Sequence, residues 1–267
     1  MVRSPAVAGQ FYAAMPERLR SQVDQYLEKD QVRESARAIV CPHAGLMYSG
    51  PVAGAVYSRV QIPDTLLLVG PNHTGLGPPL SIYAEGSWNM PNGRVAIDRR
   101  LAADLLARCP QAESDTEAHQ SEHCLEVQLP FLQQLRPAVA IVPVIMMSTE
   151  LAVCRALGEA MAAAVLEAPR PILIIASTDM SHYEPDAVAR RKDQWAIDEI
   201  LALNPAGLHR VTREKRISMC GFAPTVATLF AALRLGARRA KLVKYMTSGE
   251  TSGDYDRVVG YAGLLIV

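Results

Sequence analysis

Three histidines stand shortly after short apolar runs of the chain. A lone histidine after a strand is usually a loop residue that makes an ordinary hydrogen bond. Three at equivalent positions predict one shared site, because ligands of open α/β sheets bind outside the carboxyl ends of the strands. An acid, Asp179, lies between the third run and its histidine. The runs and their histidines are Ala36–Cys41 with His43, Thr65–Val69 with His73, and Ile172–Ala176 with His182.

A fourth reactive residue, Cys220, stands directly before Gly221 and a predicted helix. The macrodipole and free N–H groups of a helix start favour a thiolate, so we expect a lowered pKa and the most reactive of the thiols here. A thiolate with two neutral imidazoles suits Zn, Fe(II) or Cu. The alternative is a small buried apolar residue, which is what most free cysteines are, and position alone does not decide between the two.

A second group of polar residues lies near the start of a predicted helix. His119 and His123 are four residues apart, as are Glu122 and Glu126, so each pair could share one helix face. Ser121 could instead cap that helix, which would leave His119 outside it and make Glu122 a first-turn partner of the helix dipole. We favour His123 as a residue of the shared site and leave His119 out.

Apolar runs alternate with stretches of helical periodicity along the chain. The pattern predicts an α/β fold with a central, mostly parallel or mixed sheet and helices on both faces. Trp88–Ile97, with Pro91-Asn92-Gly93 inside it, predicts an added hairpin. The remaining predicted strands are Val139–Ile145, Lys241–Tyr245 and Val258–Leu265. The predicted helices are Glu17–Glu28, Val52–Arg59, Arg99–Ala107, His123–Leu135, Glu150–Leu166, Asp186–Leu203 and Thr225–Leu235.

Composition limits the classes of partner. The 27 basic and 27 acidic residues cancel, which argues against nucleic acid or an acidic membrane as a partner. No apolar run approaches the ~20 residues of a membrane span. Five scattered cysteines without a CxxC pair indicate free thiols in a reducing, cytoplasmic compartment. No linker divides the chain, so we expect a single domain over residues 1–267. Phosphate-binding glycine loops, a GxSxG elbow and an HExxH helix are all missing.

Taken together, these segments resemble the signature blocks of the Memo family. The blocks run in order from residue 3 to residue 262, so the resemblance covers almost the whole chain. They are Arg3 to Tyr12, Pro42-His43-Ala44-Gly45 with Tyr48-Ser49-Gly50, Gly70-Pro71-Asn72-His73, Glu122-His123 with Leu125-Glu126, Asp179 with Ser181-His182, Cys220-Gly221, and Ser252-Gly253-Asp254 with Val258 to Ala262.

The resemblance implies a fold like that of class III extradiol dioxygenases, which use a non-haem Fe(II). It also implies that His43, His73 and Cys220 are metal ligands and that Asp179 and His182 are neighbouring pocket residues. The bacterial and archaeal branch is known as AmmeMemoRadiSam system protein B, which suggests AMMECR1-like and radical SAM proteins as partners. The eukaryotic branch is linked to motility signalling, phosphotyrosine peptides, and iron or copper handling.

One departure from the dioxygenases affects the expected chemistry. Their iron site is completed by a carboxylate, whereas the matching residue here is Cys220. A thiolate favours softer metals, so we expect Fe(II) or Cu(I), with Zn as an alternative, and sensitivity to oxidation.

Three functions therefore compete. The first is a metal-dependent, dioxygenase-like redox enzyme acting on a small molecule, with His182 or His123 as acid or base and Asp179 orienting an imidazole. The second is a non-catalytic module that binds a peptide or a metal. The third is an accessory subunit of a radical SAM system.

Overall fold

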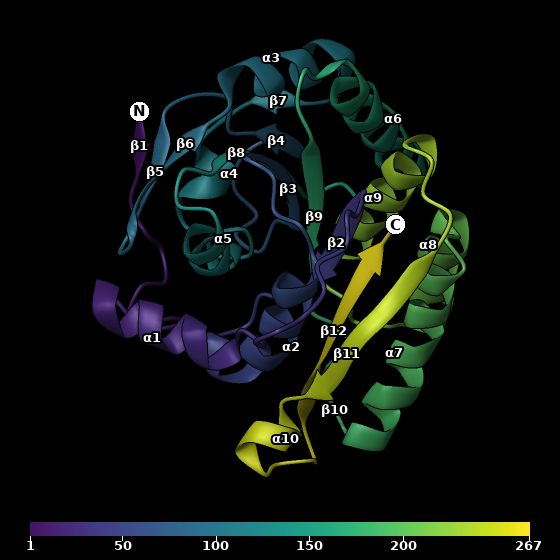
Figure 1. Cartoon of the computed structure of the whole chain (residues 1–267). Helices are drawn as coiled ribbons and strands as arrows, with labels where there is room; N and C mark the ends of the chain where they lie inside the picture. Colours follow the sequence, from purple (N-terminus) through teal and green to yellow (C-terminus); the bar gives the residue numbers. More distant parts are fainter.

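A computed structural model describes residues 1–267 and shows a mixed twelve-stranded sheet with helices on both faces (Figure 1). The strand order is β1-β5-β6-β8-β3-β9-β2-β12-β10, and the central run from β6 to β2 is parallel. This confirms the predicted fold class. The strands are β1 (Val2–Arg3), β2 (Ala38–Cys41), β3 (Thr65–Pro71), β4 (Leu80–Ile82), β5 (Ser87–Met90), β6 (Gly93–Ile97), β7 (Glu113–Ser114), β8 (Ala140–Met146), β9 (Ile172–Ser177), β10 (His182–Glu184), β11 (Ala240–Thr247) and β12 (Val258–Ile266).

Alternate residues of the central strands enter two separate hydrophobic layers, one on each face of the sheet. In β2, for example, Val40 belongs to one layer and Ile39 to the other. Both faces are buried, which explains why these strands are apolar runs without polar alternation. The two layers contain 40 and 31 buried residues, so each face has enough apolar surface to hold its helices in place.

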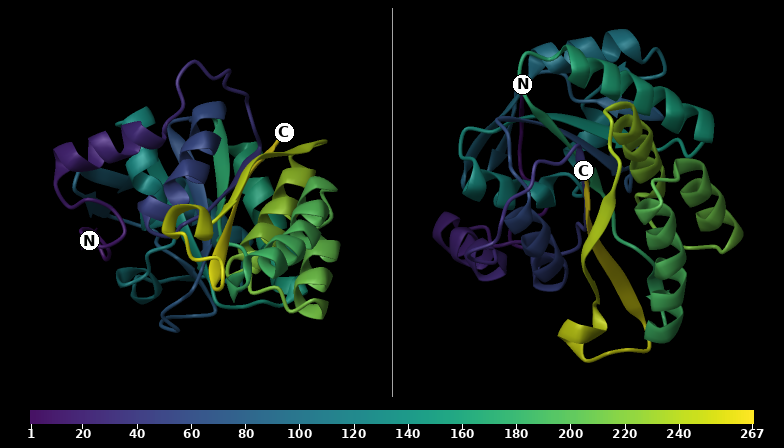
Figure 2. Two further views of the ribbon diagram at one scale, coloured as in Figure 1. Left: turned by 90° about the horizontal axis from the view of Figure 1, so that it is seen from below. Right: turned by 45° about the vertical axis from the view of Figure 1, so that its right-hand side comes forward.

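The helices divide between these layers. One layer contains residues of α3, α6, α7, α8 and α9, and the other contains residues of α1, α2 and α5 with the β5–β6 hairpin. Figure 2 shows the first group stacked along one side of the sheet. The helices are α1 (Pro16–Tyr26), α2 (Leu46–Arg59), α3 (Arg99–Arg108), α4 (Glu117–Gln120), α5 (Leu129–Leu135), α6 (Leu151–Glu167), α7 (Asp186–Leu201), α8 (Pro205–Glu214), α9 (Phe222–Arg234) and α10 (Gly249–Ser252).

Three helix predictions need correction. The helix predicted at Val52–Arg59 begins six residues earlier, at Leu46, and includes Pro51. The helix predicted over His123–Leu135 is wrong in its first part: a turn precedes a short 3-10 helix, η1 (Glu126–Gln128), and then α5. Helix α8 was missed, although Asn204 caps it directly before Pro205 and its buried Leu208 and Thr212 lie four residues apart on one face. The hairpin within Trp88–Ile97 is confirmed as β5 and β6.

The amino-terminal segment is fixed to the turn that contains His123. Arg3 is fully buried and pairs with Glu126 at 2.6 Å. Its other guanidinium nitrogens donate to the carbonyls of His119 and Glu122, each at 2.6 Å. Tyr12 and the N–H groups of Ala6 and Val7 also donate to Glu126. This turn is thus held in place by residues more than a hundred positions away along the chain.

None of the helices combines the length and the apolar character that a membrane span requires.

Candidate metal centre

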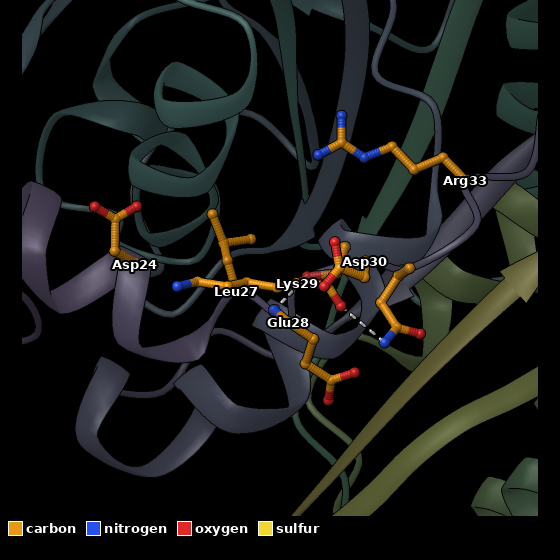
Figure 3. Close-up of a pocket in the computed structure, with 8 residues that line it drawn as sticks. Asp24, Leu27, Glu28, Lys29, Asp30 and Arg33 are labelled. Carbon is orange, nitrogen blue, oxygen red and sulfur yellow. Dashed lines mark hydrogen bonds between the residues drawn. The ribbon is translucent and has the colours of Figure 1, made fainter.

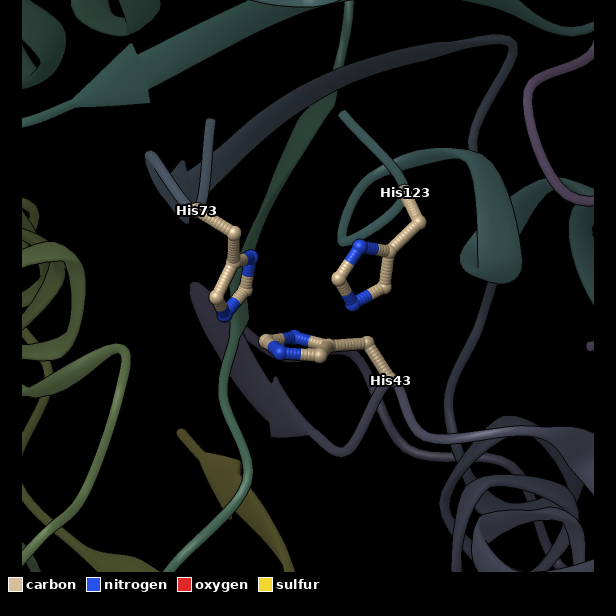
Figure 4. Close-up of side chains that lie close together, drawn as sticks. All are labelled: His43, His73 and His123. Carbon is tan, nitrogen blue, oxygen red and sulfur yellow. The ribbon is translucent and has the colours of Figure 1, made fainter. Parts of the chain in front are cut away.

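The sheet edge brings together three imidazoles from three segments. His43 follows β2, His73 follows β3, and His123 comes from the turn before η1. Ring centroids of His43 lie 5.3 Å from His73 and 5.5 Å from His123, and the last two are 4.6 Å apart. One nitrogen of each ring lies within 4.8 Å of the others. Figure 4 shows the three rings turned toward one another.

Local backbone features place His73. Gly70 lies against Cys124, whose sulfur would be 2.5 Å from a β-carbon at this position, so any side chain here would push the strand end away from the turn. The Asn72 side-chain oxygen accepts hydrogen bonds from both Thr74 donors and from Gly75, which shapes the loop into an Asx turn.

Glu122 holds the His73 side of the cluster. Its Oε1 accepts hydrogen bonds from Nδ1 of His73 at 2.8 Å and from the N–H groups of His123 and Cys124, while Oε2 accepts from the His73 N–H at 2.6 Å. Burial alone would raise the pKa of Glu122, but these hydrogen bonds lower it to about 2. The carboxylate is therefore charged at neutral pH.

The contact between Glu122 and His73 also shifts the pKa of His73, in the opposite direction to that of Glu122. Burial lowers this pKa, but the hydrogen bond and charge of Glu122 outweigh burial and raise it. The Nδ1 proton of His73 points at a carboxylate, so Nε2 is the nitrogen with a free lone pair. Because carboxylate contact raises the basicity of an imidazole ligand, His73 is a strong candidate donor.

His43 is held by a neutral partner. Its Nδ1 lies 2.9 Å from Oγ of Ser177, the last residue of β9. The expectation that Asp179 orients an imidazole is not met at His43: Asp179 Oδ1 accepts from the backbone N–H groups of His43 and Ala44, at 2.7 and 3.3 Å. Burial lowers the pKa of His43 well below the ordinary value, and the three nearby histidines lower it further.

Cys220 lies beside His43, with its sulfur 3.3 Å from Nε2. It stands two residues before α9, and the close approach of Gly221 to Ser177 and Thr178 sets this position. The expectation of a lowered pKa is wrong: burial, followed by the charge of Asp179, raises the pKa of this thiol despite the Asp179 N–H donated to it. Cys220 is the one cysteine of the five that is not fully buried.

His182 lies on the same side of the sheet but outside the group of three rings. Its Nδ1 is 2.8 Å from the carbonyl oxygen of Ser218, which can only accept, so Nε2 keeps the lone pair. The preceding residue, Ser181, donates its N–H to the buried carboxylate of Asp193, which fixes this loop. His119, by contrast, is buried between Tyr83 and Trp88.

The donor set fits a transition metal. In a tetrahedral site, two imidazole nitrogens lie about 3.3 Å apart and a nitrogen and a thiolate sulfur about 3.5 Å apart, given bonds of about 2.0 and 2.3 Å. The 3.3 Å between Nε2 of His43 and Sγ of Cys220 is close to the second value. The three donors that lie within 4.8 Å of one another are the nitrogens of His43, His73 and His123, a group that does not include Cys220. A second group of three potential ligands, His73, Glu122 and Cys124, does not fit, because both Glu122 oxygens are already occupied by N–H donors.

Three residues of the site were missed from the sequence. Glu122 was interpreted as a helix-dipole partner, although the adjacent His123 could have indicated a buried role. Ser177 and Gln128 had no signal beyond being polar residues next to apolar runs.

A cavity lies away from these residues. It has a volume of about 680 Å³ beside the end of α1, and Figure 3 shows its mostly charged, exposed lining. It contains no histidine or cysteine, so its chemistry suggests no metal site. Its lining residues are Asp24, Leu27, Glu28, Lys29, Asp30, Gln31, Arg33 and Ser58.

Comparison with known proteins gives consistent matches over the whole chain. Residues 3–265 match the family model described as Memo-like protein. A MEMO1 family protein of Methanopyrus kandleri is 42% identical over 99% of both chains, and one of Aquifex aeolicus is 41% identical over 100% of this chain and 99% of its own. An uncharacterized protein of Escherichia coli K12 has a similar structure, with a TM-score of 0.54, 14% identity, and coverage of 85% of this chain and 98% of its own. That likeness concerns the fold alone.

Proposed function

Because this chain belongs to the Memo family, we propose that it binds a transition metal ion through His43, His73 and Cys220. The supporting observation is that His43 lies close to each of the other two residues: its ring lies 5.3 Å from that of His73, and its Nε2 lies 3.3 Å from Sγ of Cys220. The donor set is soft to borderline, which favours Fe(II) or Cu(I) and also accepts Zn.

The surrounding residues support this role. Glu122 keeps the Nδ1 proton on His73 and thereby leaves Nε2 free to bind. Cys220 must lose its proton to become a ligand, so metal affinity should rise with pH. His123 is the third imidazole of the cluster and is the competing choice for the third ligand.

The activity that we propose is oxidation of a small molecule, as in the dioxygenases. A bound ion would supply Lewis acidity and a path for electrons. Burial lowers the pKa of His123, so its ring is neutral at pH 7 and able to accept a proton. Asp179 has one oxygen occupied by backbone donors, and its Oδ2, which accepts no hydrogen bond, is available to a substrate. Substrate-dependent O₂ uptake would distinguish this activity from binding without turnover and from a role as an accessory subunit for AMMECR1-like and radical SAM partners.

Metal analysis of protein purified anaerobically tests the ligand set. We expect one ion per chain in the wild type, strong loss in Cys220→Ser, and retention in His123→Ala. His209→Ala is the matched control, because His209 bonds to Thr149 away from the cluster. Loss of the metal ion in His123→Ala, with retention of the ion in Cys220→Ser, would mean that His123 and not Cys220 is the third ligand. A wild type that takes up no ion after reconstitution with Fe(II), Cu(I) or Zn would overturn the proposed function.

A further inference from the structure

Ser177 lies at the centre of a buried hydrogen-bond network behind His43. Its Oγ lies 2.6 Å from the carbonyl oxygen of Cys124, 2.9 Å from Nε2 of Gln128, and 2.9 Å from Nδ1 of His43. The side chains of Ser177, Gln128 and His43 are 0–1% exposed. Each proton in this network therefore has to go to one of these neighbours.

The orientation of the Gln128 amide is determined by two further groups. Its Nε2 lies 2.9 Å from the carbonyl oxygen of Pro42, which can only accept. Its Oε1 accepts from the hydroxyl of Tyr57 at 2.8 Å. Nε2 is thus a donor to both Pro42 and Ser177, and Gln128 cannot accept a proton from Ser177.

The single hydroxyl proton of Ser177 then has one obligate destination, the carbonyl of Cys124. The short distance of 2.6 Å agrees with this direction. Both lone pairs of Oγ are left to accept, one from Gln128 and the other from His43. Nδ1 of His43 must therefore carry the proton.

We propose that Ser177 is a positioning residue that fixes His43 as the Nδ1–H tautomer and so reserves the Nε2 lone pair for a metal ion. This inference rests on the proposed function, since it concerns one of the proposed ligands. In the other tautomer, an N–H at Nε2 would point toward Cys220, which lies 3.3 Å away, and would block the ligand position.

The arrangement makes the two imidazole ligands unequal. His73 donates its Nδ1 proton to a carboxylate, which strengthens it as a donor, whereas His43 donates to a neutral hydroxyl. Ser177 supplies orientation without adding a negative charge to the site.

The test reads the tautomer directly. Long-range ¹H–¹⁵N NMR of protein with labelled histidines reports which ring nitrogen carries the proton, and a His43→Gln variant identifies the signals of that ring. In the wild-type chain without metal, we expect Nδ1 of His43 to be protonated. In Ser177→Ala this proton loses its acceptor, so the ring should switch to the Nε2–H form, and Zn²⁺ affinity should fall 10–100-fold.

Two variants separate this role from packing. Ser49→Ala removes an equally buried hydroxyl, which donates to the carbonyl of Ala44 at 2.7 Å, and should change neither tautomer nor affinity. Ser177→Thr keeps the hydroxyl and should restore both.

The wild-type spectrum decides the matter even if Ser177→Ala does not fold. An Nε2–H signal for His43 in the wild type, or an unchanged tautomer in Ser177→Ala, overturns the proposal. A wild type with the expected tautomer that binds no Zn²⁺, Fe(II) or Cu(I) supports the assignment of Ser177 and refutes the metal function instead.

Discussion

Replacing Glu122 by glutamine should remove the main electrostatic support of the His73 loop. The carboxylate is 2% exposed and accepts four hydrogen bonds. A glutamine amide has one acceptor oxygen, so its NH₂ group would face either the His73 N–H or the three donors on the other side. The variant therefore loses the charge and creates at least one contact between donors.

The magnitude follows from the pKa of Glu122. The pKa is about 2 in the folded protein and 4.5 for an ordinary glutamate. At roughly 1.4 kcal/mol per pKa unit, this difference corresponds to about 3 kcal/mol of stability. A lowered pKa contributes stability that is present above the unfolded value and lost as pH falls through the folded value. Most of the stability contributed by the Glu122 carboxylate is lost between pH 4.5 and 2, and about 2 kcal/mol is lost between pH 5 and 3.

Urea denaturation at pH 7, 5 and 3, followed by circular dichroism, measures this. We expect Glu122→Gln to be less stable than the wild type by about 3 kcal/mol at pH 7, with the gap narrowing by about 2 kcal/mol between pH 5 and 3. Glu117→Gln is the control, because Glu117 is an exposed acid of the neighbouring α4 and should leave the pH profile unchanged. Parallel profiles of wild type and Glu122→Gln would refute the reasoning.

Three further predictions concern other parts of the molecule. Arg3→Met should destabilise the protein by about 3–5 kcal/mol in urea denaturation, because it leaves Glu126 buried without its cation, and adding Glu126→Gln should recover part of the loss. Asp98→Ala should cost about 1–2 kcal/mol in the same assay, because the Asp98 side chain caps α3. Iodoacetamide should label Cys220 before Cys154, because Cys220 is partly exposed and Cys154 is buried. The labelling rate of Cys220 should rise above neutral pH, because burial raises the pKa of this thiol; equal rates for the two cysteines in peptide mapping would contradict the prediction.

The fold was largely predictable because local and global signals agree. A strand buried on both faces, such as β3, is almost entirely apolar, and such a run can be recognised in the sequence without knowing which strands lie beside it. The boundaries were less predictable where tertiary contacts outweigh propensity. Leu46 to Pro51 form the first turns of α2 despite the proline and two small residues, because this stretch packs against Tyr26 of α1, whose ring would be 2.5 Å from a β-carbon at Gly50.

The site divides in a similar way. His43 and His73 were identifiable as candidates because they follow predicted strands at the edge where the topology collects ligands, and Cys220 because it precedes a predicted helix. The turn containing His123 was misread as helical, because its shape depends on Arg3 and Glu122 rather than on its own periodicity.

The protonation of the proposed ligands is the property that the sequence predicts least. Whether Cys220 is a thiol or thiolate depends on burial and on the charge of Asp179, which outweigh the helix start that the sequence suggested. Which nitrogen of His43 keeps its lone pair depends on the single proton of Ser177, which in turn depends on the carbonyl of Cys124 and the amide of Gln128. Residue type and spacing therefore select the candidate ligands, while hydrogen bonds between segments distant in the chain decide which of their atoms can bind.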